Sequence, residues 1–560
     1  MILTCSEMQA LEQRAFAGGS AAAALMDEAG LEIAAAVRQF FPVPGKCVVA
    51  FGKGHNGGDA LVAARHLAAR GWQLELRPAL DRAAWSPLTA QQHAALLDAH
   101  PERSAIARLG KGQALIVLDG LLGLGAGGAL REPVRAAARE INRLRAEENA
   151  HVFALDLPTG LDGDTGAADA DAVRADFTLT IGFAKRGLVA DAATPFVGRL
   201  AVLPLAELSA RMDESGARET VATAPTLAPL LPRRAFDLHK GQCGRVGLVA
   251  GSVGLTGAAV LCAEACVHAG AGLVTLYVTP DIYPLIAARI APEVMVKAVA
   301  SFDAVLAARH DVLAVGPGLG TGRAEEILSL IERAPQPMVV DADALNILAT
   351  RPDALARCAG PRLLTPHPGE MARLFPESAK LSRRATAEDF TARFPVTLLL
   401  KGARTLVAER GRALSYNSTG SPGMATGGMG DVLTGVCAAL AGQRLALHDA
   451  ARLGAWLCGR AAELAVFGGA ESEESLSARH VIARLGDACK NLRAGCWYAA
   501  HPPATFARHV HRTRRRNGRA PRPRPHRRRR APHPARPAGR CRCAAGRQHC
   551  GERLLPHGHG

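Results

Sequence analysis

Residues 420–435 read Gly-Ser-Pro-Gly-Met-Ala-Thr-Gly-Gly-Met-Gly-Asp-Val-Leu-Thr-Gly, and this stretch decides the fold class that we expect. Its glycines permit a backbone in which consecutive N–H groups point at one anion. From Asp431 onward, apolar residues recur at helical spacing, so the loop is predicted to lead into a helix N-terminus, which favours negative charge. The stretch therefore predicts a phosphate-binding loop followed by a helix.

Asp431 falls in the first turn of that predicted helix. A carboxylate there would accept a proton from a substrate hydroxyl while the hydroxyl oxygen attacks a terminal phosphoryl group. The alternative is an ordinary glycine-rich turn in which Asp431 is only a favourable charge at a helix N-terminus. Other stretches of the chain must decide between the two.

The composition favours a multidomain α/β protein. A length of 560 residues with 48% hydrophobic side chains is enough for at least two domains, and only 4% of the residues are aromatic. The sequence shows no signal peptide and no long uncharged apolar run, so we expect a cytoplasmic location and no membrane contact. The 13 cysteines lack the spacing of a disulfide framework and are expected to be free thiols.

The formal charge of +16 does not belong to the part of the chain that is expected to fold. Residues 501–560 contain 17 arginines, no lysine and one acidic residue, so the whole excess lies there. The remaining 500 residues are neutral on balance. The charge is therefore no evidence that the folded domains bind nucleic acid.

In the first part of the chain, helices are expected within 6–41, and a glycine loop at 52–59 should precede a helix over 60–70. The predicted strands are 46–51, 114–118, 152–155 and 177–181. Polar residues follow successive strands, and ligands of open α/β sheets gather at the carboxyl ends of strands. Asn56, Asp119 and Thr159 are oxygen donors suited to a hard cation, and Asp156 is the candidate acid or base. Taken singly, each is more often a cap or turn residue.

Residues 211–228 are predicted to be a linker between two domains. In the second domain the predicted strands are 245–250, 274–278, 312–315, 338–340, 362–365 and 396–400, and a turn back along the sheet edge is expected at 406–408. Alternating strands and helices predict a mainly parallel sheet with helices on both faces. The ends of these strands and the loop at 420–431 should lie together.

Several long motifs occur in a fixed order along residues 1–493. The first part contains GKGHNGGD (52–59), LDGLLGLG (118–125) and ALDLPTGLDGDTG (154–166). The second contains HKG (239–241), GSVGLTGAA (251–259), GPGLG (316–320), DADALN (341–346), LTPHPGE (364–370), LKGART (400–405) and NSTGSPGMATGGMGDVLTG (417–435). The sequence resembles the bifunctional NAD(P)H-hydrate repair enzymes.

The resemblance implies two α/β domains: a Rossmann-like three-layer epimerase domain at 1–210 and a ribokinase-like αβα dehydratase domain at 229–493. The first would interconvert the R and S hydrates NADHX and NADPHX. The second would remove water from the S hydrate at the expense of ADP, giving AMP and phosphate. It also implies potassium in the epimerase domain, magnesium with the nucleotide, and a homo-oligomer.

The resemblance also implies roles for individual residues. Asp431 and Asp156 would be catalytic, and potassium would be held by Asn56, Asp119 and Thr159. The epimerase would bind the hydrate through His55, Asn56, Gly57, Gly58, Asp59, Gly123, Leu124, Gly125, Ala126, Gly127, Gly128, Ala129 and Asp156. The dehydratase would bind it through Ala258, Gly318, Gly320, His367 and Asp431, and the adenine nucleotide through Lys401, Gly402, Ala403, Arg404, Thr405 and Gly430.

Four residues leave alternatives open. The family usually has Asn in place of His55 and Ser in place of Thr159; Thr keeps the hydroxyl, whereas His55 adds a titratable ring or is a solvated loop residue. Asp341 and Asp343 would assist a nucleotide-bound magnesium or cap a helix, and we favour capping.

Residues 494–560 are rich in Arg, Pro and His and resemble neither domain. Such a composition cannot bury a core, so we expect a disordered tail, and a shifted GC-rich reading frame would produce it. The alternatives are an arm that binds RNA or a membrane surface, and a metal cluster of Cys541, Cys543, His549 and Cys550, whose spacing matches no closed zinc motif.

Two other functions remain open. A kinase of a small hydroxylated vitamin precursor would use the same loop and Asp431 but leaves the first domain unexplained. A non-enzymatic protein would use the first domain to sense nucleotides and the tail to bind RNA.

Overall fold

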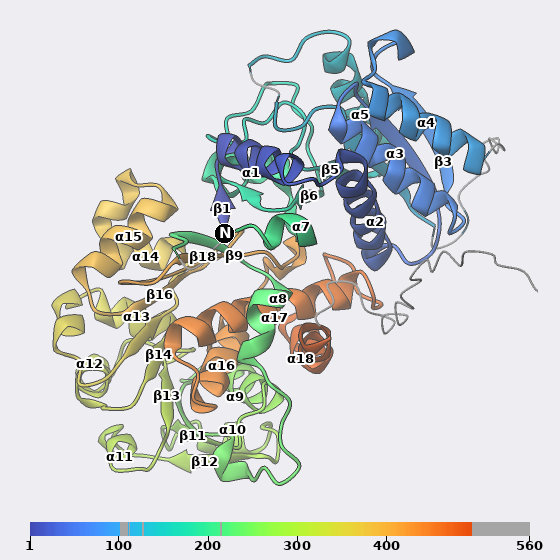
Figure 1. Cartoon of the computed structure of the whole chain (residues 1–560). Helices are drawn as coiled ribbons and strands as arrows, with labels where there is room; N and C mark the ends of the chain where they lie inside the picture. Colours follow the sequence, from blue (N-terminus) through green and yellow to red (C-terminus); the bar gives the residue numbers. More distant parts are fainter. Residues whose placement is uncertain (101–109, 111–112, 126–127, 213–215, 495–560) are drawn as a thin grey trace, which may run out of the picture. The chain divides into compact units, whose positions relative to one another are not determined.

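The computed structural model describes residues 1–100, 110, 113–125, 128–212 and 216–494 (Figure 1). All the described residues belong to one compact unit. The tail predicted at 494–560 lies outside the described residues except for Ala494. Within the described residues, no helix has both the length and the apolar character needed to cross a membrane.

The first domain is built on a six-stranded parallel sheet in the order β3-β2-β4-β5-β6-β8. Its strands are β2 (Lys46–Phe51), β3 (Gln73–Pro78), β4 (Leu115–Gly120), β5 (His151–Leu155), β6 (Phe177–Ile181) and β8 (Arg199–Leu203). Two short strands, β1 (Ile2–Leu3) and β7 (Ala184–Lys185), pair separately. The four strands predicted from buried apolar runs are confirmed, and β3 and β8 were missed.

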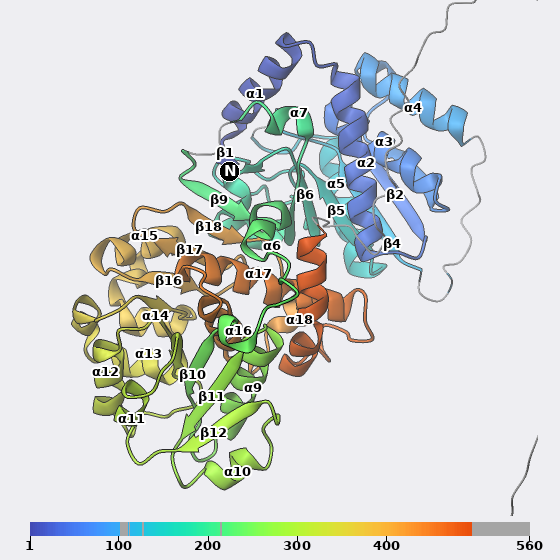
Figure 2. The same cartoon turned by 60° about the horizontal axis from the view of Figure 1, so that its bottom comes forward.

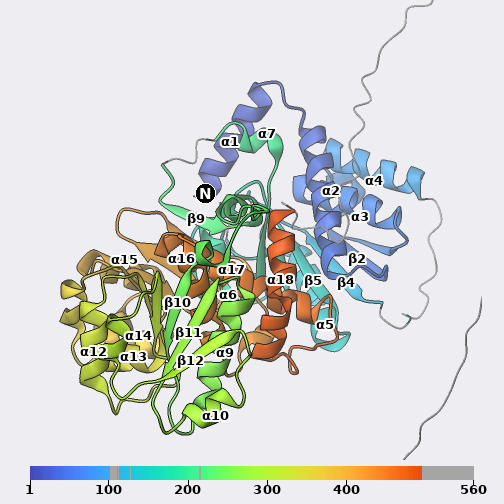
Figure 3. The ribbon, with the colours of Figure 1, turned by 90° about the horizontal axis from the view of Figure 1, so that it is seen from below.

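Helices cover both faces of this sheet, which confirms the three-layer arrangement (Figure 3). Alternate strand residues separate the two faces: Val49 packs in the core with α2 and α3, whereas Val48 packs with α5. The helices are α1 (Cys5–Ala17), α2 (Ala22–Phe40), α3 (His55–Ala68), α4 (Pro87–Ala99), α5 (Val134–Glu147), α6 (Thr194–Val197) and α7 (Ala206–Ser209).

The second domain contains a ten-stranded sheet in the order β12-β11-β10-β13-β14-β15-β16-β17-β18-β9. All neighbours are parallel except that β17 runs antiparallel to β16 and β18. The strands are β9 (Glu219–Ala222), β10 (Arg245–Val249), β11 (Leu273–Val278), β12 (Val294–Ala298), β13 (Val312–Val315), β14 (Met338–Val340), β15 (Arg362–Leu364), β16 (Thr397–Leu400), β17 (Leu406–Glu409) and β18 (Leu414–Asn417).

Helices also lie on both sides of the second sheet (Figure 2). One layer contains α9 (Thr256–His268), α16 (Met429–Gly442), α17 (Leu447–Val466) and α18 (Ala478–Arg493). The other contains α12 (Ala324–Arg333), α13 (Ala342–Leu348), α14 (Pro368–Leu374) and α15 (Arg383–Arg393). Short helices are α8 (Ala224–Leu227), α10 (Tyr283–Ala287) and α11 (Asp303–Leu306).

Three expectations need correction. The expected linker 211–228 contains strand β9, which pairs with β18 and forms the edge of the second sheet. The turn back after β16 is confirmed, but β17 is not the edge, because β18 and β9 follow it.

Residues 55–59 form the first turn of α3 rather than a loop, because Gly57 and Gly58 allow close packing. A Cβ added to Gly57 would lie 2.2 Å from Gly52 O, and a Cβ added to Gly58 would lie 2.5 Å from Met26 Sδ. The outer limits of the domains stay predictions.

An aromatic cluster joins the two domains. Phe467, which follows α17, lies edge-on to Phe40 at 5.2 Å between ring centroids and 5.6 Å from the ring of Phe177. Phe153 and Phe177 of the first sheet stack at 4.5 Å. Aromatic pairs at such distances add attraction beyond the burial of area.

Candidate active sites

The glycine-rich loop leads directly into helix α16. Gly428, the residue before the helix, has a φ of 89°, a left-handed conformation that favours glycine. Asp431 lies in the first turn, as predicted. A Cβ added to Gly430 would lie 3.4 Å from Lys401 Nζ and 3.5 Å from Asp341 Oδ2, so the start of the helix faces a charged pair.

The pKa of Asp431 is raised to about 6, first by burial and then by the neighbouring carboxylates of Asp341 and Asp343, while Lys401 opposes the shift. A carboxyl group with a pKa near neutrality is suited to take up and release a proton under physiological conditions. The raised pKa and the place of Asp431 at the start of α16, beside Lys401, together make it the candidate base of this domain.

Asp341 and Lys401 form a buried pair beside Asp431. Asp341 is 1% exposed; its Oδ1 accepts a hydrogen bond of 2.7 Å from Lys401 Nζ, and its Oδ2 accepts one of 2.7 Å from Thr434 Oγ1. Burial lowers the pKa of Lys401, but Asp341 and Glu370 raise it on balance. The ammonium therefore stays charged at the edge of the glycine-rich loop, where it would attract phosphate.

The preference for helix capping was wrong for Asp341. Asp341 precedes α13, but its carboxylate makes no hydrogen bond to the helix backbone and serves Lys401 and Thr434 instead. Thr434, which sequence reasoning missed, follows Asp431 by three residues and so lies on the same face of the helix. The spacing of three residues between Asp431 and Thr434 is the feature of the sequence that could have identified Thr434.

Three of the predicted hydrate-binding residues of the second domain, Ala258, Gly318 and Gly320, lie on loops that contact each other, and Gly320 contacts Asp343. Its Oδ2 accepts a 2.8 Å hydrogen bond from Gly320 N. Ser252 Oγ donates to Gly318 O at 2.9 Å, and a Cβ added to Gly318 would lie 2.9 Å from the Cβ of Ala258. The loops after β10 and β13 thus contact each other beside Asp343.

His367 caps helix α14 and presents its ring to solvent. Its Nδ1 accepts hydrogen bonds from Gly369 N and Glu370 N at 3.0 and 3.2 Å, so a neutral ring carries its proton on Nε2. Glu370 Oε2 accepts from His367 N at 2.8 Å and lies 3.7 Å from Lys401 Nζ. The predicted His367 is therefore linked to the Asp341–Lys401 pair through Glu370, which the sequence had not singled out.

The predicted nucleotide loop, 401–405, connects β16 to β17. Its Arg404 has a φ of 53° and donates a 2.6 Å hydrogen bond from Nη2 to Thr194 Oγ1 of the first domain. Burial, with a smaller contribution from Arg383, lowers the pKa of Arg404 to about 10. The guanidinium is thus engaged by the first domain, which leaves the backbone of Gly402, Ala403 and Arg404 as the part suited to a nucleotide.

A cavity of about 550 Å³ lies in the first domain at the carboxyl ends of its strands. Predicted residues that line it are His55, Asn56, Asp59, Gly123, Leu124, Gly125 and Asp156. Lining residues that the sequence analysis missed include Gln9, Glu12, Phe16 and Met26, which come from α1 and α2. The predicted Gly57 and Gly58 are buried in the first turn of α3, Gly128 and Ala129 are exposed, and Ala126 and Gly127 lie outside the described residues.

Asp156 is held in a strained conformation at the end of β5. Its φ of 65° is left-handed, which is rare for a residue other than glycine and is found preferentially at functional sites. Its Oδ1 accepts hydrogen bonds from Ile181 N at 3.1 Å and from the ammonium of Lys185, which is 0% exposed. Lys185 also donates to Ile181 O at 2.9 Å.

Two further carboxyl groups share this environment. Burial raises the pKa of Asp59 well above its ordinary value, and Asp156 and Glu12 add to the shift. Burial also raises the pKa of Glu12. Lys185, Glu12 and the strain at Asp156 were not recognised in the sequence, because they depend on the packing of α1 and β7 against the sheet.

The predicted cation ligands lie close together beneath the cavity. Asp119, 0% exposed, accepts hydrogen bonds from Thr159 Oγ1 at 2.7 Å and Thr159 N at 2.8 Å. Asn56 Nδ2 donates to Leu122 O at 2.6 Å, and Thr159 Oγ1 accepts from Leu122 N at 3.3 Å. Burial raises the pKa of Asp119 to about 6.

Asn56 Oδ1 is buried and has no hydrogen-bond partner. A buried carbonyl oxygen without a partner is costly, and a cation would satisfy it. The oxygens of Asn56, Asp119 and Thr159 thus fit a hard cation.

Two family models match the chain. Residues 22–187 match the YjeF-related protein N-terminus and residues 246–478 match NAD(P)H-hydrate dehydratase. The chain is 38% identical to the bifunctional NAD(P)H-hydrate repair enzyme of Moorella thermoacetica over 78% of this chain and 87% of the relative. The chain belongs to the bifunctional NAD(P)H-hydrate repair enzymes. The first domain is accordingly an epimerase domain and the second a dehydratase domain, and the match to dehydratases disfavours the vitamin-precursor kinase.

Two further relatives extend the comparison. The bifunctional NAD(P)H-hydrate repair enzyme of Coxiella burnetii is 35% identical over 83% of this chain and 95% of its own. A solved ADP/ATP-dependent NAD(P)H-hydrate dehydratase from Bacillus subtilis, co-crystallised with ATP and Mg²⁺, is 28% identical and covers 49% of this chain and 99% of its own, with a TM-score of 0.43.

Proposed function

We propose that Asp431 is the base of the dehydratase domain and that ADP is its phosphoryl donor. The hydroxyl oxygen of the S hydrate attacks the terminal phosphorus of ADP, the bond to AMP breaks, and Asp431 takes the hydroxyl proton. Phosphate then leaves with the electrons of the ring C–O bond while the adjacent ring carbon loses a proton, which restores the reduced nicotinamide. The observation that carries this proposal is the raised pKa of Asp431 in the first turn of α16, beside Lys401.

The amides at the start of α16 and the ammonium of Lys401 would stabilise charge on the transferring phosphoryl group. Gly402 to Arg404 would bind the nucleotide through the backbone, and Thr405 would complete the loop. Ala258, Gly318, Gly320 and His367 would face the hydrate. The test is recovery of reduced-nicotinamide absorbance from a mixed R and S hydrate preparation supplied with ADP, magnesium and potassium; binding of ADP without recovery would overturn it.

Magnesium would accompany the nucleotide phosphates and neutralise part of their charge. The carboxylate of Asp341 is already paired with the ammonium of Lys401, which would repel a metal ion, so Asp341 is poorly suited as a ligand. Asp343 is the better candidate, because among the described residues its Oδ1 accepts only a long hydrogen bond of 3.4 Å from Asn346. Among the described residues, no three His, Cys, Asp or Glu side chains converge on a metal position.

The dehydratase reaction is expected to lose rate in acid. A base works only when ionised, so kcat/KM should be constant above the pKa of Asp431, about 6, and fall tenfold for each pH unit below it. The measurement is kcat/KM for the S hydrate from about pH 5 to about pH 8, with thermal unfolding recorded at each pH as a control. A rate that stays constant down to about pH 5 would rule out Asp431 as the titrating base.

In the epimerase domain, Asp156 is the proposed acid and base. Inversion at the hydroxyl-bearing carbon requires that a bond to this carbon breaks and reforms on the other face, and both steps move a proton. Asp156 lines the cavity and is oriented by Lys185. His55, Asp59, the strand-end residues at 123–129 and the amides at 56–58 would surround the hydrate, although 126 and 127 lie outside the described residues.

Potassium would be held by Asn56, Asp119 and Thr159 and would order the loops that border the cavity. Replacing Thr159 with valine removes the hydroxyl between Asp119 Oδ1 and Leu122 N. We expect the potassium concentration needed for half-maximal thermal stabilisation to rise roughly tenfold. Thr178→Val is the matched control, because Thr178 is also buried but its hydroxyl bonds Val197 O.

The measurement is thermal unfolding in potassium chloride against a bulky monovalent salt at equal ionic strength. Equal stabilisation of Thr159→Val and the unchanged protein would contradict the site. Assembly into a homo-oligomer and a cytoplasmic location stay predictions.

A further inference from the structure

A short segment of the epimerase domain, residues 191–199, contacts the dehydratase domain at Arg383, Arg404 and Glu463. It comprises the turn Asp191–Ala193, helix α6 and the first residue of β8. Three of its side chains make polar contacts across the domain boundary: Asp191 with Arg383, Thr194 with Arg404, and Arg199 with Glu463. Arg404 belongs to the loop at 401–405, Arg383 of α15 hydrogen-bonds that same loop, and Glu463 of α17 hydrogen-bonds the start of the loop at 420–431.

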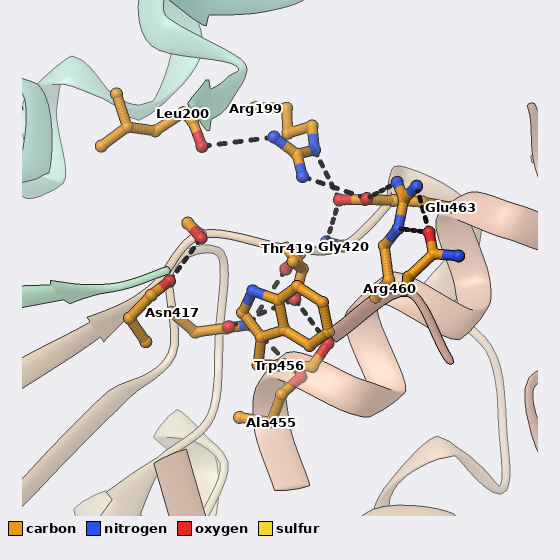
Figure 4. Close-up of polar contacts among 12 residues, drawn as sticks. Arg199, Leu200, Asn417, Thr419, Gly420, Ala455, Trp456, Arg460 and Glu463 are labelled. Carbon is orange, nitrogen blue, oxygen red and sulfur yellow. Dashed lines mark hydrogen bonds and ion pairs between the residues drawn. The ribbon is translucent and has the colours of Figure 1, made fainter. Parts of the chain in front are cut away.

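The contact of Arg199 with Glu463 is largely shielded from solvent. Arg199 is 7% exposed and Glu463 is 0% exposed, and the guanidinium donates through Nε to Oε1 and through Nη2 to Oε2 at 3.0 Å (Figure 4). Arg460 adds a 2.9 Å hydrogen bond to Oε2. Burial by itself would raise the pKa of Glu463, but the two arginines lower it on balance, so the carboxylate stays ionised.

Glu463 also holds the glycine-rich loop, through the oxygen that accepts from Arg199 Nε. Its Oε1 accepts a 3.0 Å hydrogen bond from Gly420 N, the first residue of the stretch that leads to Asp431. The preceding Thr419 is anchored by its Oγ1, which donates to Trp456 O at 2.9 Å (Figure 4). The position of the loop entrance therefore depends on a carboxylate whose charge is balanced in part by the epimerase domain.

The second loop is held in a similar way. Arg383 donates from Nη1 to Ala403 O at 2.8 Å and from Nη2 to Leu400 O at 3.3 Å. Asp191 Oδ2 accepts a 3.0 Å hydrogen bond from the backbone of Arg383, and Thr194 accepts from Arg404. These contacts fix the backbone that would meet the nucleotide.

Simple adhesion between the domains does not explain this pattern. The aromatic cluster around Phe467 already provides apolar contact between the domains. The polar contacts instead reach the loops: Thr194 binds the Arg404 side chain, while Arg383 and Glu463 carry the other two contacts on to the backbone of Ala403 and Gly420. Buried charged hydrogen bonds have strict geometry, so they are suited to positioning.

We infer that residues 191–199 of the epimerase domain position the two loops of the dehydratase site, with Arg199 as the positioning residue for the glycine-rich loop. The inference rests on the proposed role of residues 420–431 in phosphoryl transfer. The epimerase domain then contributes to the rate of a reaction that takes place in the other domain.

The test compares full-length Arg199→Met and Arg199→Lys with Arg139→Met. Arg139→Met controls for the loss of an ion-paired arginine that makes no contact with the dehydratase domain in the described structure, because Arg139 pairs with Asp171 inside the epimerase domain. Arg199→Met should lower the dehydratase kcat on the order of tenfold or more, since small displacements of catalytic groups have effects of this size. The KM for ADP should change less, the epimerase rate should stay within about twofold, and Arg199→Lys should recover part of the loss.

A second variant, Thr194→Val, tests the contact with the loop at 401–405. Because Thr194 contacts the nucleotide loop, this variant should raise the KM for ADP more than it lowers kcat. Hydrogen exchange of the peptide covering 418–432 should be faster in Arg199→Met and unchanged in Arg139→Met. This readout does not depend on activity, so it separates the inference from the proposed role of Asp431.

The double variant Arg199→Met/Glu463→Gln tests the cause. Because Arg199 acts on the loop through Glu463, the losses of dehydratase kcat in the single variants Arg199→Met and Glu463→Gln should not add in the double variant. The inference is overturned if exchange of 418–432 is unchanged in Arg199→Met, or if both activities fall in equal proportion at temperatures well below the unfolding transition.

Discussion

Replacing Asp431 with asparagine is expected to lower the dehydratase rate about 10²- to 10⁴-fold, the usual contribution of a general base. The amide has nearly the same shape but cannot accept the hydroxyl proton. The Asp341–Lys401 pair beside it keeps both of its hydrogen-bonding partners, so the loop should stay in place. The measurement is single-turnover recovery of reduced nicotinamide from S hydrate, with the epimerase rate of the same preparation as an internal reference.

The same substitution is expected to increase the stability of the folded protein although it lowers the dehydratase rate. The pKa of Asp431 is raised to about 6 in the folded protein, so its ionised form is disfavoured there relative to the unfolded chain. This destabilisation is present at neutral pH and disappears as the pH falls through the folded-state pKa. Asp431→Asn should therefore raise the unfolding temperature at neutral pH while activity is lost.

Asp303→Asn is the control for this substitution. Asp303 also lies in the first turn of a helix, α11, but its side chain is 65% exposed. The control should leave the dehydratase rate unchanged. A dehydratase rate of Asp431→Asn within about tenfold of the unchanged protein would exclude Asp431 as the base.

Replacing Asp156 with asparagine is expected to abolish most of the epimerase activity, again by about 10²- to 10⁴-fold. The dehydratase domain should continue to consume the S hydrate. In a mixed preparation, the reduced-nicotinamide absorbance should then rise rapidly only to the level set by the fraction of S hydrate. The remainder should follow at the rate at which the R hydrate epimerises spontaneously. The final level and the two phases of the absorbance trace report this directly.

Asp156→Asn should also destabilise the epimerase domain, because it leaves the ammonium of Lys185, 0% exposed, without its carboxylate. Breaking one partner of a buried pair costs about 3–5 kcal/mol. The double variant Asp156→Asn/Lys185→Met removes both charges and should recover much of this stability. It should not recover activity, and a double variant that epimerises at the normal rate would contradict the catalytic role of Asp156.

Much of the architecture was predictable because strands buried on both faces leave a strong local signal. The runs KCVVAF at 46–51 and VLAV at 312–315 are apolar over their length, and the structure places them in β2 and β13. The missed β9 and β18 hold buried polar residues, and Glu219 of β9 finds its partners far away in the sequence. Glu219 accepts a hydrogen bond from Tyr416 OH at 3.1 Å, almost 200 residues away.

The sequence by itself determined the family, the two α/β domains, the strand ends that carry Asp119 and Asp156, and the glycine-rich stretches that carry Asn56 and Asp431, because glycine-rich stretches and strand ends are local patterns. Only the tertiary structure decided which charged side chains form ion pairs with each other. Lys185 beneath Asp156, Lys401 on Asp341 and Arg199 on Glu463 join residues from different elements. Burial sets the energy of these charges, and burial arises only when the helices and sheets pack together.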